Sequence, residues 1–169
     1  MKPWGLVVAM TFLAGAAGAK NAPIGTWNDP NLDGWEPGRT KPPRMIQRVK
    51  KEGTDGKGCL MVLTVTGWSQ AAATDKGKVL LAKGDTITLD VFARKEDFPH
   101  GMLKIGIGIQ SDKLNFDELP LQDVKFDEWQ TLTFPYDRER HKQPQWTLIN
   151  IITMTDDAGT VLIDNVRIE

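Results

Sequence analysis

The chain has 169 residues, and its 21 Lys and Arg against 22 Asp and Glu give a formal net charge of −1 at pH 7. This balance gives no reason to expect nucleic acid or an anionic membrane surface as a partner. The single cysteine, Cys59, excludes an internal disulfide, and its place in the apolar stretch GKGCLMVLTV predicts a small buried strand residue.

The N-terminal segment, residues 1–19, has the features of a signal peptide. Lys2 precedes a short apolar run, and small residues follow that end in the cleavage pattern Ala17-Gly18-Ala19. The run is too short for a stop-transfer helix, so no membrane span is expected. We therefore predict a secreted or periplasmic protein whose mature part, residues 20–169, forms one domain; an uncleaved N-terminal anchor is the alternative.

After this leader, the apolar runs alternate with period two and are separated by turn sequences such as TDGKG, AKGD and DDAG. The clearer strand candidates are 59–67, 78–82, 85–94, 103–110, 129–136, 146–154 and 160–169, and the weaker ones are 24–28, 44–50 and 121–126. The long connections are expected at 28–43, 67–77, 94–101, 111–119 and 137–145. Many short strands without helices between them predict an all-β fold, an antiparallel β-sandwich or barrel.

Alternation within the strands predicts which residues share a face. In 103–110 the isoleucines form a core face, while Gly106 and Gly108 leave a shallow trough on the other, where either a ligand approaches closely or the sheet bends. Asp90, Gln110 and Asn150 are predicted to line one polar face, unless they are ordinary solvated positions.

Two tryptophans lie beside amide side chains. Trp68 precedes Gln70, and Trp146 precedes Asn150. Such pairs suit sugar rings, because a pyranose stacks on the indole while its hydroxyls bond to amides. The alternative for each is a partly buried rim residue. Two further tryptophans, Trp27 and Trp129, are predicted to belong to the core.

The sequence lacks the usual motifs of catalysis. His100 and His141 are the only histidines, both in predicted loops, and no metal-binding, nucleophile-elbow or phosphate-loop motif is present. A pair of glycosidase carboxylates remains an alternative. The basic segment 39–51 is interpreted as a protected edge strand, with a polyanion-binding patch as the alternative.

Six segments, in chain order, resemble secreted carbohydrate-binding modules with a galactose-binding-like jelly roll. They are WNDPNLDGWEPG, DGKGCLMVLTVTG, KGDTITLDVFAR, LKIGIGIQSD, VKFDEWQTLTFPY and VLIDNVRIE, and they cover about residues 24 to 169. The resemblance implies a single-domain antiparallel β-sandwich. It says less about a ligand, because function depends on the site and not on the fold.

The same resemblance implies a structural calcium ion joining the first and last strands. Its ligands would be Asn28 or Asp29 in the opening motif, backbone near Asp55–Lys57, and Asp164 of the DNV ending. Asn28 stands where the family usually has Glu, and one negative charge fewer weakens a calcium site. A calcium-free version held by hydrogen bonds therefore stays open.

Together these patterns predict non-catalytic binding of a β-linked polysaccharide or oligosaccharide. The candidate ligand contacts are Trp68, Gln70, Asp90, Gln110, Trp146 and Asn150. One alternative is a cell-envelope structural or protein-interaction module that has lost sugar binding, which inward-turned tryptophans would favour. Another is a small glycan-active hydrolase or lyase. Envelope proteins or glycan-degrading proteins are the expected partners.

Overall fold

The computed structural model of the chain describes residues 23–28, 31–39, 41–73, 81–110, 116–137, 146–154 and 156–169. The predicted signal peptide, 1–19, lies outside these ranges. So does most of the expected strand 78–82, whose last two residues are described but are not in a strand.

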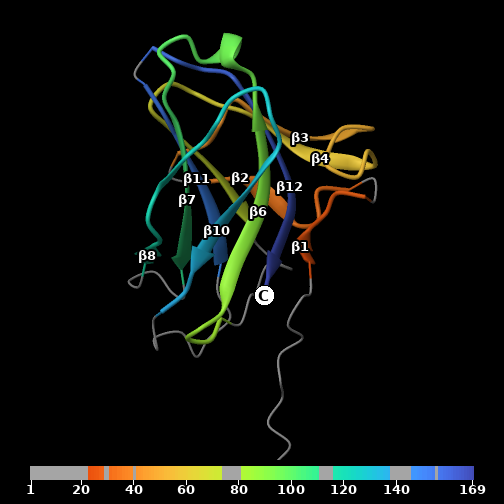
Figure 1. Cartoon of the computed structure of the whole chain (residues 1–169), viewed down its shortest axis with the longest axis vertical. Helices are drawn as coiled ribbons and strands as arrows, with labels where there is room; N and C mark the ends of the chain where they lie inside the picture. Colours follow the sequence, from red (N-terminus) through yellow and green to blue (C-terminus); the bar gives the residue numbers. More distant parts are fainter. Residues whose placement is uncertain are drawn as a thin grey trace, which may run out of the picture.

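The strands form two antiparallel sheets, which confirms the predicted β-sandwich (Figure 1). Sheet A contains, in order, β10 (Gln130–Pro135), β6 (Thr86–Ala93), β12 (Thr160–Ile168), β4 (Gly58–Leu63) and β3 (Met45–Lys50), with β1 (Pro23–Gly25) paired to β12. Sheet B contains β2 (Trp35–Pro37), β5 (Trp68–Ala73), β11 (Trp146–Thr153), β7 (Leu103–Gln110) and β8 (Phe116–Glu118), with β9 (Gln122–Asp123) paired to β7. Within the described ranges, the 3-10 turn η1 (Lys95–Asp97) is the one helical element.

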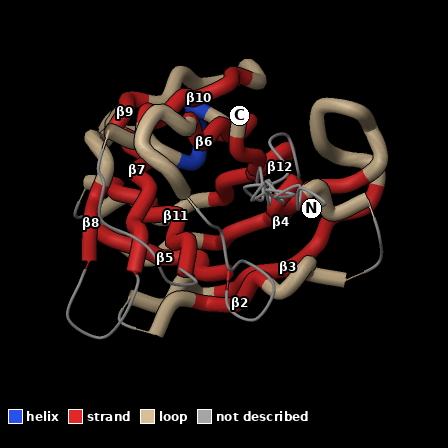
Figure 2. Tube along the Cα trace, turned by 90° about the horizontal axis from the view of Figure 1, so that it is seen from below, coloured by secondary structure: helices blue, strands red, loops and turns tan. Residues whose placement is uncertain are grey.

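The core lies between the two sheets and is built by the predicted alternation. Ile105, Ile107 and Ile109 of β7 are fully buried, as are the inward residues of β6 and β12. Trp27 and Trp35 close one side of the core, with ring centroids 5.9 Å apart. Figure 2 shows β2 of sheet B beside β3 of sheet A, where the two sheets meet.

Two local predictions are confirmed by the structure. Cys59 is fully buried in β4. The basic segment supplies β3, which is the last strand of sheet A and therefore an edge strand. The charged side chains along β3 protect this edge from pairing with another chain.

Three strands lie where the sequence predicted connections. β2 lies in the expected connection 28–43, β5 in 67–77 and β8 in 111–119. The sequence of β5, WSQAAA, contains no β-branched residue, so its pattern did not indicate a strand. It is extended because β2 and β11 pair with it on both sides.

Candidate functional site

The candidate site is the outer face of sheet B. The register sets Trp68 and Gln70 of β5 opposite Ile152 and Asn150 of β11. Asn150 in turn is opposite Gly106 of β7. The residues between these positions point into the core. We call this outer surface the sheet B face; it carries Trp68, Gln70, Gly106, Gly108, Gln110, Glu118 and Asn150.

A chain of side-chain hydrogen bonds crosses the middle of the sheet B face. Gln70 Nε2 donates to Asn150 Oδ1 over 2.8 Å, and Asn150 Nδ2 donates to Glu118 Oε1 over 2.9 Å. Gln70 is 4% exposed and Asn150 is fully buried, whereas Glu118 is exposed. The two amides therefore hold the Glu118 carboxylate at the surface. In this arrangement they bind each other and do not face solvent.

Glu118 was not among the predicted contacts. It lies in a segment expected to be a connection, and only the pairing of β8 with Gly108 of β7 brings it beside the amides. An acidic pair, Asp117 and Glu118, was visible in the sequence, but nothing in the pattern connected it with Asn150.

Trp68 lies on the sheet B face and not in the core. Its ring is half-buried, and the Lys41 ammonium lies 5.6 Å from the ring centroid, within reach of a cation–π contact. The indole N–H is buried and has no hydrogen-bond partner among the described residues. A buried donor without a partner is costly, so Trp68 retains unused hydrogen-bonding capacity.

The trough predicted over Gly106 is filled by a side chain of the protein itself. A Cβ atom at Gly106 would lie 2.6 Å from Leu121 Cδ2. Leu121 is 42% exposed, so it covers the strand without being enclosed. The glycine is thus explained by the close approach of Leu121.

The prediction that Asp90 shares a face with Gln110 and Asn150 is wrong. Asp90 belongs to β6 in sheet A, where it accepts hydrogen bonds from Thr131 Oγ1 and from Asn165 Nδ2, the latter over 2.9 Å. Alternation identifies the outward side of each strand but not the sheet to which the strand belongs. Asp90 is therefore separated from the sheet B face by the core.

The remaining two predicted contacts lie at one end of the sheet B face. Gln110 is half-buried at the end of β7, and it pairs with Trp146, the first residue of β11. The side chain of Trp146 is outside the described part of the structure. Its predicted stacking role stays a prediction.

Two of the segments that the resemblance assigns to a metal converge on a protein cation. The Arg48 guanidinium donates through Nε to the carbonyl oxygen of Trp27, and through Nη2 to those of Asn28 (3.0 Å) and Lys57 (3.3 Å). These oxygens belong to the opening motif and to the loop that the resemblance assigned to calcium. A guanidinium in this position excludes a second cation from the same oxygens.

Asp55 and Asp164, the two carboxylates among the predicted metal ligands, accept hydrogen bonds from groups of the protein. Asp55 accepts a bond from the Lys57 backbone N–H over 2.9 Å, and this bond is the main reason that its pKa is lowered. Asp164 Oδ2 accepts from both the N–H and the hydroxyl of Thr54, each over 2.9 Å. Burial raises the pKa of Asp164, an effect that the bonds from Thr54 oppose.

These residues therefore do not fit a calcium ion in their present arrangement. Nor does the described part of the chain contain another group of three or more His, Cys, Asp or Glu residues suited to a metal. In the structure, hydrogen bonds from Arg48 and Thr54 join these segments, as the calcium-free alternative expects. Calcium binding itself stays a prediction for experiment.

The DNV ending contains a β-bulge that explains its polar pair. Asn165 has a φ of 48°, in the left-handed region, and the register of β12 against β6 shifts between Asp164 and Arg167. Asparagine is one of the few residue types that adopt this conformation readily. The bulge directs Asp164 to Thr54 and Asn165 to Asp90.

Comparison with solved structures shows that the fold is that of carbohydrate-binding modules. A structure on the promiscuous specificity of β-sandwich carbohydrate-binding modules superposes with a TM-score of 0.70 and 15% identity, over 89% of this chain and 62% of that chain. The CBM22-1 xylan-binding domain of Paenibacillus barcinonensis Xyn10C has a TM-score of 0.64 and 15% identity, over 90% and 97% of the two chains. A CBM28 module specific for non-crystalline cellulose has a TM-score of 0.62 and 13% identity, over 89% and 96%.

Sequence comparison alone does not reach this result. No protein-family model matches the chain, and no curated protein matches it.

In the described ranges no helix is both long and apolar enough to cross a membrane.

Proposed function

We propose that the protein is a non-catalytic carbohydrate-binding module that binds a β-linked glycan on the sheet B face. One observation carries the proposal. On a β-sandwich, the half-buried Trp68 and the exposed Glu118 lie on one face, and the hydrogen bonds from Gln70 to Asn150 and from Asn150 to Glu118 cross that face.

The chemistry of this face suits a sugar. The exposed part of the Trp68 ring offers an apolar surface for the C–H face of a pyranose, and Lys41 beside it offers a donor to a ring hydroxyl. At the other end Glu118 accepts hydroxyl protons, and a charged acceptor makes the stronger type of hydrogen bond. Gln70 and Asn150 position Glu118 and do not need to touch the ligand themselves.

Binding can be tested with two probes that match the comparison structures. Isothermal titration with xylohexaose, and a pull-down on regenerated non-crystalline cellulose, should each be made with the wild type, Trp68→Ala and Glu118→Gln. We expect at least one probe to bind, and both variants to weaken that binding tenfold or more. The control is Glu169→Gln, which removes a carboxylate paired with Arg167 far from the face and should bind as the wild type does.

A second candidate function is a structural or protein-interaction module that keeps the fold without sugar binding. The observation in its favour is the burial of Gln70 and Asn150, whose amide groups are engaged with each other. If neither probe nor a wider panel of β-glucans, xylans, mannans and galactans binds the wild type, this candidate replaces the first.

We also infer export of the protein from its N-terminus. Lys2, the apolar run and the pattern Ala17-Gly18-Ala19 support this inference. N-terminal sequencing of the protein recovered from outside the cytoplasm should begin at Lys20. Recovery of the intact N-terminus would instead indicate an uncleaved anchor.

A further inference from the structure

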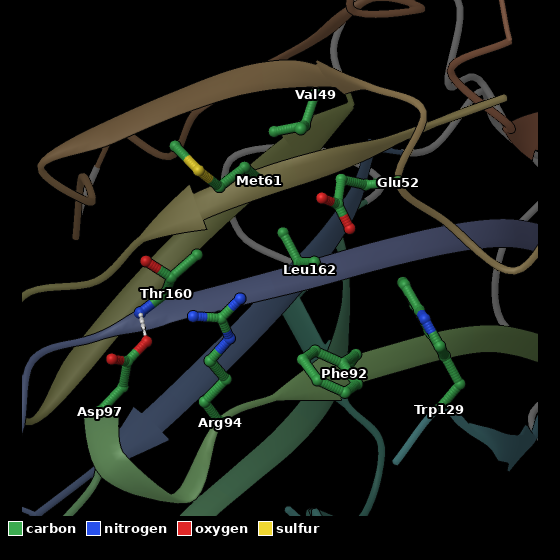
Figure 3. Close-up of a pocket in the computed structure, with 9 residues that line it drawn as sticks. All are labelled: Val49, Glu52, Met61, Phe92, Arg94, Asp97, Trp129, Thr160 and Leu162. Carbon is green, nitrogen blue, oxygen red and sulfur yellow. Dashed lines mark hydrogen bonds between the residues drawn. The ribbon is translucent and has the colours of Figure 1, made fainter. Parts of the chain in front are cut away.

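A cavity of about 390 Å³ opens on the outer side of sheet A, on the opposite side of the sandwich from the sheet B face (Figure 3). Its floor is a row of side chains from three neighbouring strands. Met61 of β4 is opposite Leu162 of β12, and Leu162 is opposite Phe92 of β6. The row is half-buried, so an apolar strip remains accessible from solvent.

An aromatic pair forms one end of this cavity. Trp129 and Phe92 have ring centroids 5.6 Å apart and planes inclined by 39°. The sequence predicted Trp129 as a core residue, but it is only half-buried and lines the cavity. This tryptophan therefore presents part of its ring to a ligand.

Polar groups of both charges surround the apolar floor. The Glu52 carboxylate has no hydrogen bond or ion pair with any described residue. Arg94 is largely exposed and pairs only loosely with Glu96, at 3.5 Å. Asp97 Oδ2 accepts a bond from the Thr160 backbone N–H over 3.2 Å, drawn as a dashed line in Figure 3.

We propose that this cavity is a second carbohydrate-binding site, for a short segment of a neutral β-linked glycan. The ligand class of this second site rests on the proposed function, but different residues form the site. An apolar floor with an aromatic end suits the C–H faces of a sugar, and donors and acceptors side by side suit its hydroxyls. Because the charges at the rim are mixed, they do not select a strongly charged ligand. The volume lies within the range of small-ligand sites.

Two sites on opposite sheets would make the protein bivalent. A ligand chain on the sheet B face does not compete for the cavity, because the core separates the two surfaces. Two modest affinities on one insoluble polysaccharide then combine into stronger retention, as for any pair of linked sites.

The tryptophan indole N–H signals separate the two sites in solution. We would titrate ¹⁵N-labelled protein with xylohexaose, and separately with cellohexaose, and follow the Trp68 and Trp129 signals in the wild type, Trp68→Ala, Trp129→Ala and Glu52→Gln. Glu52→Gln removes an exposed charge without disturbing the packing, so it remains informative if Trp129→Ala misfolds. We expect Trp129 to shift in the wild type and in Trp68→Ala. Glu52→Gln should weaken this response tenfold or more and leave the Trp68 response unchanged.

Each outcome of the titration is decisive. A shift of Trp68 alone overturns the second site and leaves the proposed function intact. A shift of Trp129 alone supports the cavity and overturns the assignment of the sheet B face. The absence of any shift with either oligosaccharide overturns the second site, and the polysaccharide panel then decides the proposed function.

Discussion

The Arg48 side chain reaches from edge strand β3 to the opening motif and donates a hydrogen bond from Nη2 to the carbonyl oxygen of Asn28 over 3.0 Å. Through Nε it also binds the carbonyl oxygen of Trp27, and Nη2 binds that of Lys57 in the β3–β4 loop. One permanently charged group thus joins the N-terminal segment to this loop. A guanidinium thus binds carbonyl oxygens in the two segments to which the family resemblance assigns a calcium ion.

The first prediction concerns this cation. Arg48→Ala should lower the free energy of unfolding by about 3 kcal/mol, because three backbone acceptors lose a charged donor at once. Chemical denaturation of the variant and the wild type measures the loss. Arg44→Ala is the matched control, because the Arg44 side chain is exposed and makes no hydrogen bond or ion pair with a described residue.

The same arrangement predicts the response to chelation. EDTA should leave the melting temperature of the wild type unchanged, since Arg48 already occupies the carbonyl oxygens. A clear fall in melting temperature with EDTA, restored by added calcium, would contradict this view and establish the calcium site that the resemblance implies.

The second prediction concerns the DNV ending. Asp164→Ala removes the acceptor of three donors, namely the N–H and hydroxyl of Thr54 and the N–H of Asn165. A loss of about 2–3 kcal/mol follows from leaving such groups without a partner. For a chain of this size the melting temperature should fall by roughly 4–12 °C. Asp123→Ala, which breaks only the exposed pair with Lys104, should change it little.

The sequence predicts features that neighbouring residues determine better than features that depend on contacts between distant segments. Regular alternation of β-branched residues is a local property, and it predicted β7 and β12 almost to the residue. Pairing of strands distant in sequence is not local. For that reason the alanines of β5 were not predicted as a strand, and Asp90 was assigned to the wrong sheet.

The same limit applies to the sites. Asn150 was predicted to face outward from the periodicity of its strand, whereas Trp68 and Gln70 were chosen for their side-chain chemistry in a segment expected to be a connection. Glu118 lies in a segment predicted as a connection, and Trp129 begins a predicted strand whose neighbours the sequence does not give, so only the fold brings one to Asn150 and the other to Phe92. Arg48 belonged to a segment interpreted as a protected edge strand. That interpretation is confirmed, but it gave no indication that the guanidinium turns inward to the backbone carbonyl groups.

The third prediction concerns pH. His100 Nδ1 lies 2.7 Å from Oδ1 of the buried Asp157, and the bond to this carboxylate raises the pKa of His100 above its usual 6.5. A raised pKa in the folded state means that protonated His100 adds stability below pH 6.5, and that this contribution disappears as the pH rises through the folded-state pKa. The difference in unfolding free energy between the wild type and His100→Gln should therefore shrink as the pH rises above 6.5. A difference that is constant with pH would contradict the ion pair.

The fourth prediction compares two glycines beside the sheet B face. A Cβ atom at Gly38 would lie 2.4 Å from Gln70 Cβ and 2.9 Å from the Gln70 carbonyl oxygen, so the backbones of the two segments would have to move apart. A Cβ atom at Gly106 would lie 2.6 Å from Leu121 Cδ2, the end of a side chain that is 42% exposed, and at an ordinary contact distance of 3.7 Å from Glu118 Oε1 and the Leu119 carbonyl oxygen. Gly38→Ala should thus cost about 2 kcal/mol or more, and Gly106→Ala about 1 kcal/mol or less.

The two variants should also differ in binding. Gly38→Ala displaces Gln70, whose side chain donates a hydrogen bond to Asn150, and Asn150 in turn donates to Glu118. Oligosaccharide binding on the sheet B face should therefore weaken several-fold, even at temperatures where the variant is fully folded. Gly106→Ala leaves that chain of hydrogen bonds in place and should bind almost as the wild type does. Titration of both variants with xylohexaose or cellohexaose measures the contrast. Equal loss of binding in the two would show that the amide chain does not position Glu118.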